Sequence, residues 1–154
     1  MAEILKGDRF DLVEFDFILD RVSYSPEVRV ECSIGEKVFV GELLIEFEGC
    51  TTVLEYMSFE GWLREEVEAK PTTIEEATRM IFDEVVRALG DIPVRVLMRA
   101  TTAVHAPVTV EIKSKLWRLR DGQKYDSHGG SARWWLRRSS TYSGRGSNPS
   151  GSGR

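Results

Sequence analysis

The hydrophobic period changes twice along this chain, and the order of the changes restricts the fold that the chain can adopt. Alternating apolar and polar residues first predict three strands, over residues 10–20, 27–32 and 37–49. Apolar residues then recur every three or four positions between residues 51 and 90, which predicts two helices. Alternation returns over residues 92–102 and 106–112. Strands at both ends of a helix pair predict an α+β fold, an antiparallel sheet with two helices packed on one face.

The two predicted helices carry local signals at their ends. Thr52 followed by Glu55 predicts a capping box at the start of the first helix, and Thr73 with Glu76 predicts one for the second. Gly90 fits the position just beyond the end of the second helix. The apolar stripe of the first helix is predicted to contain Tyr56, Phe59, Leu63 and Val67.

Charge divides the chain near residue 112. Residues 1–112 hold 11 Lys and Arg against 23 Asp and Glu, a net charge of −12, whereas residues 113–154 hold 10 against 2, a net charge of +8. The second part is also rich in Gly and Ser and has little hydrophobic periodicity. We therefore predict a folded domain over residues 1–112 and a basic C-terminal extension over residues 113–154, with its distal part disordered.

The extension combines Arg with Trp, which favours contact with RNA. Guanidinium groups pair with phosphates, and indole rings stack on unpaired bases. The predicted RNA-binding residues are Arg133, Trp134, Trp135, Arg137 and Arg138. The alternative is a solvated extension with no partner.

Several classes of protein are disfavoured by composition. No apolar run approaches the length of a membrane span, and the start "MAEILKGDRF" lacks the pattern of a secretory signal. The chain is therefore expected in the cytoplasm, without a membrane partner and with Cys32 and Cys50 reduced. These cysteines form no zinc spacing with His105 or His128, so no metal site is predicted.

Cys32 has two interpretations on the residues alone. It lies in "VRVECSIGEKVFVG" between two predicted strands, where a cysteine is either a small buried apolar residue or a thiolate nucleophile. Glu55 and Glu75 are equally ambiguous, because carboxylates are favoured in first helical turns without any ligand. Ser58 can be an ordinary surface residue, and Cys50 matches no motif and is interpreted as structural.

Two stretches carry a resemblance to a known family. "CSIGEKVFVGELLIEF" and "VLEYMSFEGWL" resemble the QueF-type 7-cyano-7-deazaguanine reductases and their archaeal QueF-like relatives, over roughly residues 28–112. The resemblance implies the tunnelling fold, in which sheets of several subunits join into an oligomeric barrel with substrates at subunit interfaces. It further implies that Cys32 is the nucleophile and that Glu55, Ser58 and Glu75 bind the deazapurine.

The chemistry implied by the resemblance starts with a thiolate that adds to the nitrile carbon and forms a thioimide. The reductases then use NADPH, whereas the archaeal relatives let ammonia displace the thiol and make the amidine of archaeosine in tRNA. This chain departs from the family at three places. Phe39 replaces the aspartate proton donor, Ile74 replaces a histidine before Glu75, and "TTAVHAPVT" lacks the Pro-Arg-Gly-Gly stretch that holds NADPH.

We therefore predict a homo-oligomeric, QueF-like amidinotransferase without a cofactor, acting on tRNA or on a deazapurine. Two alternatives stay open. One is a non-catalytic RNA-binding or assembly protein on the same fold, and the other is an NADPH-dependent nitrile reductase.

Overall fold

A computed structural model describes residues 1–35, 37–100 and 107–126 of the chain. The chain divides into two units, Met1–Leu119 and Arg120–Arg154. The strands are β1 (Glu3–Leu5), β2 (Leu12–Tyr24), β3 (Glu27–Glu31), β4 (Val38–Leu54), β5 (Val94–Ala100) and β6 (Val108–Lys113). The helices are α1 (Tyr56–Trp62), its π-helical continuation η1 (Leu63–Val67), α2 (Ile74–Leu89) and α3 (Lys115–Asp126).

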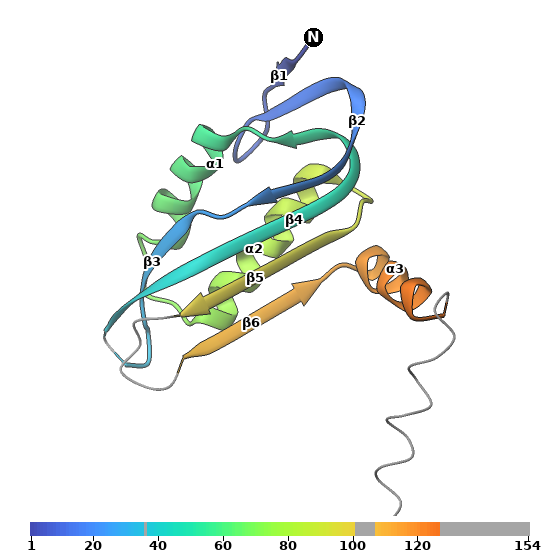
Figure 1. Ribbon diagram of the computed structural model, residues 1–154. Coiled ribbons are helices and arrows are strands. Elements are labelled where there is room, and N and C mark those ends of the chain that lie inside the picture. The colour runs from blue at the N-terminus through green and yellow to red at the C-terminus, as the bar shows by residue number, and fades with distance from the viewer. Residues whose placement is uncertain (36, 101–106, 127–154) are drawn as a thin grey trace, which may run out of the picture. The chain divides into compact units, whose positions relative to one another are not determined.

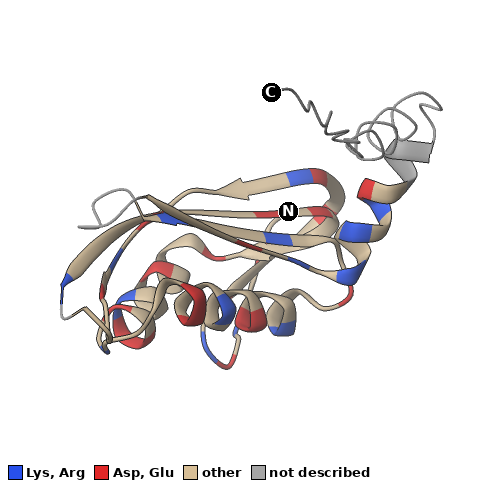
Figure 2. Ribbon diagram, turned by 90° about the horizontal axis from the view of Figure 1, so that it is seen from below, with Lys and Arg blue, Asp and Glu red and all other residues tan. Residues whose placement is uncertain are grey.

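The strands form one antiparallel sheet in the order β1-β2-β4-β5-β6, and β3 pairs with β4. The 17-residue strand β4 is long enough to pair with β2 along one part of its edge and with β3 along another (Figure 1). Helices α1 and α2 cover the same face of this sheet (Figure 2). The predicted fold class, an antiparallel sheet with two helices on one face, is therefore confirmed.

The core lies between the sheet and the two helices. Alternate residues of β3, β4 and β5 face it, because successive side chains of a strand point to opposite faces. The side chains without exposed surface include Val28, Val30, Ile45, Phe47, Val94, Val96 and Met98 from the strands and Phe59, Val67, Ile81 and Val85 from the helices. The opposite face carries ion pairs between strands, such as Arg95 with Glu46 at 2.7 Å and with Glu111 at 2.6 Å.

The predicted start of the first helix is wrong by several residues. Thr52 lies in β4, where it pairs with Glu14 of β2, and the strand continues to Leu54. Sheet pairing therefore prevails over the local capping signal. Glu55 itself is the N-cap of α1. At the second helix the prediction is confirmed, because Thr73 and Glu76 form the capping box and Gly90 is the C-cap with φ of 75°.

Strand β2 contains an irregularity that changes which of its residues face solvent. The pairing register with β4 shifts between Glu14 and Leu19. Such a bulge breaks the alternation of the two faces. Phe17 and Ile18, which lie inside it, are 53% and 69% exposed.

The extension begins with α3, a helix that the weak hydrophobic periodicity of this segment does not predict. Its first turn is attached to the sheet by Ser114, whose hydroxyl accepts from the amides of Val94 (2.9 Å) and Trp117 (3.3 Å). Trp117 is buried, and the Arg21 guanidinium lies 5.8 Å from the centroid of its ring. The domain boundary at residue 112 stays a prediction.

Candidate functional site

Cys32 lies directly after β3, in a turn that backbone hydrogen bonds hold against the segment preceding α2. The amide of Cys32 donates to the carbonyl of Lys37 at 2.8 Å. Two further bonds join this turn to the segment before α2: the Ser33 amide donates to the Thr72 carbonyl (3.1 Å), and the Thr72 amide donates to the Glu31 carbonyl (2.9 Å). These bonds place Cys32 beside Thr72, which is 40 residues further along the chain and just before the first turn of α2.

A pocket of about 280 Å³ opens at this junction. It is lined by Cys32, Ile34, Gly35, Phe39, Thr73, Ile74, Glu75, Ala100 and Val108. Cys32 is partly exposed, and its Sγ accepts from the amide of Gly35 at 3.4 Å. The thiol is therefore not sealed in the core. The volume is close to the lower end of the roughly 300–1,000 Å³ typical of small-molecule sites.

Glu75 is a lining residue of the same pocket, and its side chain is exposed. Its neighbour Glu76 is used differently, because the Glu76 carboxylate accepts from the Thr73 amide (3.3 Å) and from the Thr72 hydroxyl (3.1 Å) as part of the helix cap. The structure thus brings Cys32 and Glu75 together and assigns Glu76 to the capping box.

Phe39 forms part of the pocket wall and is 6% exposed. By the sequence resemblance, this is the position at which the QueF-type family is expected to have its aspartate. Among the described residues that line the pocket, Glu75 is the one with a carboxyl group. Any proton delivered inside this pocket by a described acidic side chain must therefore come from Glu75 or from the Cys32 thiol.

Glu55 and Ser58 lie at the start of α1. The Glu55 carboxylate accepts from the amides of Met57 (3.2 Å) and Ser58 (2.7 Å). The hydrogen bond from the Ser58 amide is the main reason that the pKa of Glu55 is lowered, so this group stays ionised. Ser58 Oγ accepts from the Asp11 amide at 2.8 Å and donates to the Glu55 carbonyl at 3.2 Å. Both residues thus stabilise the helix start, whatever else they bind.

Within one chain, the structure separates these two pairs of predicted site residues. Glu55 follows the last residue of β4, whereas the turn that holds Cys32 lies beside the first residues of β4. The 17 residues between these ends correspond to about 50 Å in a straight strand at ~3.3 Å per residue, less where the strand bends. Glu55 and Ser58 do not line the Cys32 pocket.

A column of three aromatic rings ends beside Glu55, at Tyr56, and the sequence pattern did not predict a binding role for these rings. Tyr24 stacks on Phe47 and on Tyr56, with ring centroids 6.0 and 5.9 Å apart. Burial and the nearby Glu55 charge raise the pKa of Tyr24 to about 12. A possible signal in the sequence is the neighbouring pair Glu55-Tyr56 at the junction of strand and helix.

The other candidates lie elsewhere. Cys50 is a buried residue of β4, and burial raises the pKa of its thiol, which fits the structural interpretation. The predicted RNA-binding residues, both histidines and most of "TTAVHAPVT" lie outside the described residues.

In the part of the chain that is described, no group of three or more His, Cys, Asp or Glu side chains has the geometry to hold a metal ion. None of the described helices combines the length and the apolar character needed to cross a membrane.

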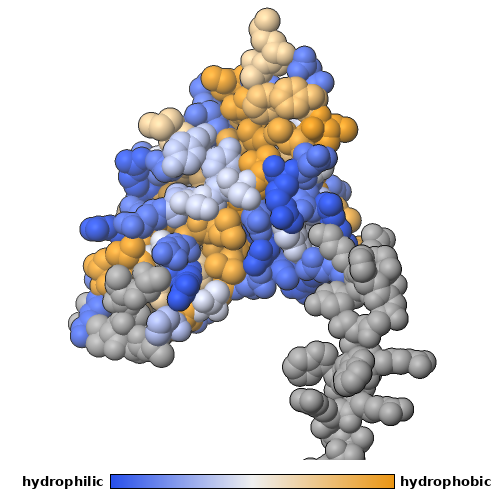
Figure 3. Space-filling view, viewed as in Figure 1, coloured by the Kyte–Doolittle hydropathy of each residue, from blue (hydrophilic) through white to orange (hydrophobic). Residues whose placement is uncertain are grey.

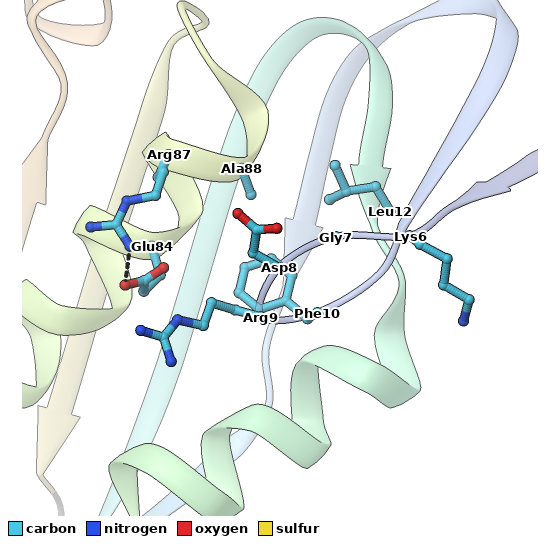
Figure 4. A pocket seen from close by; sticks show the side chains of 9 residues that line it. All are labelled: Lys6, Gly7, Asp8, Arg9, Phe10, Leu12, Glu84, Arg87 and Ala88. Atoms are coloured by element: carbon cyan, nitrogen blue, oxygen red, sulfur yellow. Dashed lines mark hydrogen bonds and ion pairs between the residues drawn. The ribbon is translucent and has the colours of Figure 1, made fainter.

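A second pocket, of about 270 Å³, lies between the Lys6–Leu12 segment and the last turns of α2 (Figure 4). Phe10 and Leu12 supply apolar surface, and Arg87 forms an ion pair with Glu84 at its side. None of the predicted site residues lines this pocket.

This geometry defines a class of protein: an α+β domain whose antiparallel sheet carries two helices on one face. A pocket with a cysteine lies at the junction of strand, turn and helix. The crystal structure of the archaeosine synthase QueF-Like in the apo form has this fold, with a TM-score of 0.55 to the present chain. The two sequences are 18% identical, and the match covers 62% of this chain and 94% of the other. The predicted resemblance is thus confirmed for the fold.

The sequence itself matches no family model and no curated protein. At 18% identity the structural likeness establishes architecture and leaves the activity to be argued from the site.

Proposed function

We propose that this protein is a tRNA-modifying enzyme of the deazaguanine class, which forms a thioimide between Cys32 and the nitrile of 7-cyano-7-deazaguanine and passes it to ammonia. The observation that carries the proposal is the shared pocket of Cys32 and Glu75, in a fold that the archaeosine synthase QueF-Like also has. A protein with this activity works on tRNA in the cytoplasm.

The proposed reaction has two steps. In the first, the Cys32 thiolate bonds to the nitrile carbon, one carbon–nitrogen π bond breaks, and the nitrogen takes a proton to give the thioimide. In the second, ammonia adds to the same carbon and loses a proton, the carbon–sulfur bond breaks, and the thiolate leaves. The product is an amidine. No electrons are transferred, so this reaction requires no NADPH.

Recognition of the base is assigned to carboxylates. A carboxylate accepts hydrogen bonds, and the edge of a deazaguanine offers a ring N–H and an amino group as donors. Glu75 lies in the pocket with Cys32, whereas Glu55 and Ser58 lie at the other end of β4. We therefore infer a site built by two copies of the chain, with Cys32 and Glu75 from one copy and Glu55 and Ser58 from the next.

Open sheet edges support such an assembly. Among the described strands, β6 pairs on one side only, and β1 pairs with only three residues of β2. An unpaired edge is a template for pairing with another chain. Apolar surface lies over β1 and β2 at the top of Figure 3. Ile4 of β1 and Phe17 and Ile18 of β2 are more than half exposed. Homo-oligomers formed through these edges follow from the proposal.

A thioimide is detected by mass. We expect intact-mass spectra of the full chain incubated with 7-cyano-7-deazaguanine to show a mass increase equal to one molecule of this nitrile. The Cys32→Ala chain should show no mass increase. The matched control is Cys50→Ala, which removes a thiol that is 6% exposed and should leave the adduct unchanged. Addition of ammonium should then release the amidine. An adduct that persists in Cys32→Ala, or that never forms, rules out the proposed enzyme.

The second candidate function is a non-catalytic RNA-binding or assembly protein, and Phe39 favours it because this ring occupies the position of the family's proton donor. Binding of tRNA without any adduct is its signature. The NADPH reductase gains no support from the residues described, and a fall in NADPH absorbance during incubation with the nitrile would identify it.

The basic extension is proposed as the RNA-binding arm of either protein. Residues 127–154 contain five Arg and no Asp or Glu. We expect the 1–126 chain, which retains Trp117, to bind tRNA more weakly than the full chain and with a shallower dependence of affinity on salt, because fewer counterions are released. Titrations at two salt concentrations measure both quantities. Equal affinity and equal salt dependence in the two chains would contradict the proposal that the extension binds RNA.

A further inference from the structure

Tyr56 departs from the role that the sequence pattern gives it. The predicted apolar stripe of the first helix contains Tyr56, Phe59, Leu63 and Val67, and the last three are buried at 0–3% exposure. Tyr56, in contrast, is 46% exposed. An aromatic ring of this size left open at the start of a helix is a departure from the local pattern of the kind expected at functional sites.

The inner side of the Tyr56 ring is occupied by a column of aromatic rings. Phe47 has no exposed surface and stacks on Tyr24 with an interplanar angle of 28°, and Tyr24 stacks on Tyr56 with an angle of 14°. The Tyr24 hydroxyl donates to the Leu54 carbonyl at 2.5 Å, which holds the middle ring against β4. The column therefore begins in the core and ends at Tyr56, at the surface.

The hydroxyl of Tyr56 is held as well. It hydrogen-bonds to the carboxylate of Glu60, one turn further along α1, and this bond raises the pKa of Tyr56. With one face stacked and the hydroxyl bonded, the ring is positioned before any ligand arrives. Preorganisation of this kind lowers the entropy lost on binding.

The surroundings of Tyr56 select for a neutral, planar ligand with donors on its edge. Glu55 precedes Tyr56, and each of its carboxylate oxygens accepts one amide hydrogen bond and has a further lone pair. The negative charges of Glu55 and Glu60 disfavour a phosphate at this place. A purine-like base fits, because its face stacks on an aromatic ring and its N–H groups meet a carboxylate.

We propose that Tyr56 is the stacking platform for the deazapurine base, extending the ring column of Phe47 and Tyr24 by one further ring. The proposal rests on the proposed function, in which Glu55 recognises the same base. Tyr56 is then a residue that determines affinity for planar bases, while Cys32 of the neighbouring copy performs the covalent step.

The test is the affinity for 7-cyano-7-deazaguanine, measured by calorimetry on the full-length Cys32→Ala protein, in which no thioimide forms. Stacking of a base on an aromatic ring contributes about 1–3 kcal/mol, so Tyr56→Leu should weaken binding roughly 5- to 150-fold. Tyr56→Phe and Tyr56→Trp retain an aromatic face and should stay within about threefold of the parent. Met57→Ala is the matched control, because Met57 is 67% exposed and lies outside the column.

The outcomes separate this proposal from the proposed function. If Tyr56→Leu binds as tightly as the parent while Glu55→Ala loses binding, the stacking platform is overturned and base recognition stands. If the parent does not bind the base, both are overturned. Weakening by Tyr56→Leu together with equal weakening by Tyr56→Phe and Tyr56→Trp would also overturn it, since the hydroxyl and not the ring would be responsible. Circular dichroism of each variant shows that the fold is retained.

Discussion

Phe39→Asp is expected to accelerate thioimide formation by about 10²–10⁴-fold, the usual contribution of a positioned general acid. Phe39 lines the pocket that holds Cys32, and the sequence resemblance implies an aspartate at this position in the QueF-type family. The apolar walls formed by Ile34, Ile74 and Val108 should raise the pKa of the new carboxyl group, so that it carries a proton near neutral pH. It would then donate this proton to the nitrile nitrogen as the thiolate adds.

Phe39→Asn is the control for this variant, because asparagine has the same size and no acidic proton. Both substitutions remove a buried ring and should lower the free energy of unfolding by about 3 kcal/mol. The measurement is the rate of mass gain in a single turnover, with Val38→Asp as a second control at a position that is 61% exposed. Equal rates for the Asp and Asn variants would show that proton delivery does not limit the reaction.

The largest effect on stability is expected for Phe59→Ala, which should lower the free energy of unfolding by about 3–5 kcal/mol. Phe59 has no exposed surface and joins α1 to the rest of the core. Its ring meets Phe10 edge to face at 5.1 Å and stacks on Trp62 at 5.7 Å. A small domain is stable by only about 5–15 kcal/mol, so this loss is a large part of the total.

Denaturant unfolding of the full chain measures this loss. Met57→Ala lies two residues earlier in the same helix, removes a comparable amount of apolar side chain from an exposed position, and should change stability by less than about 0.5 kcal/mol. Since Glu55 is the N-cap of α1, Phe59→Ala should also weaken the base binding that we propose for Glu55. A loss of stability no larger than that of Met57→Ala would show that α1 contributes little to the core.

The second helix and the positions of the core strands could be predicted from the residues themselves. The capping box of Thr73 and Glu76 and the terminal Gly90 involve residues that are neighbours in sequence, so their geometry follows from local chemistry. The buried stripe of Ile74, Ala77, Ile81 and Val85 is likewise a matter of helical spacing. The same holds for strand alternation, which separates the charged face of the sheet from its apolar face.

The start of α1 and the helix after β6 could not be predicted in this way. A capping signal at Thr52 competes with pairing to Glu14, a residue 38 positions away, and the hydrogen bonds of the sheet prevail. Helix α3 depends on Trp117 packing against the sheet beside Arg21, a contact that local periodicity does not contain.

The candidate site shows the same division most clearly. The residue types alone left Cys32 and the carboxylates at the two helix starts ambiguous, and the resemblance to the QueF-type family implied a nucleophile and base-binding groups. Which of them meet was settled by long-range backbone pairing, since the bonds from Thr72 to Glu31 and from Ser33 to Thr72 bring Glu75 to Cys32. The length of β4 keeps Glu55 at the opposite end, and Tyr56 of α1 stacks on Tyr24, the last residue of β2. The sequence shows which chemical groups a site can contain, whereas the distances between these groups depend on the tertiary structure.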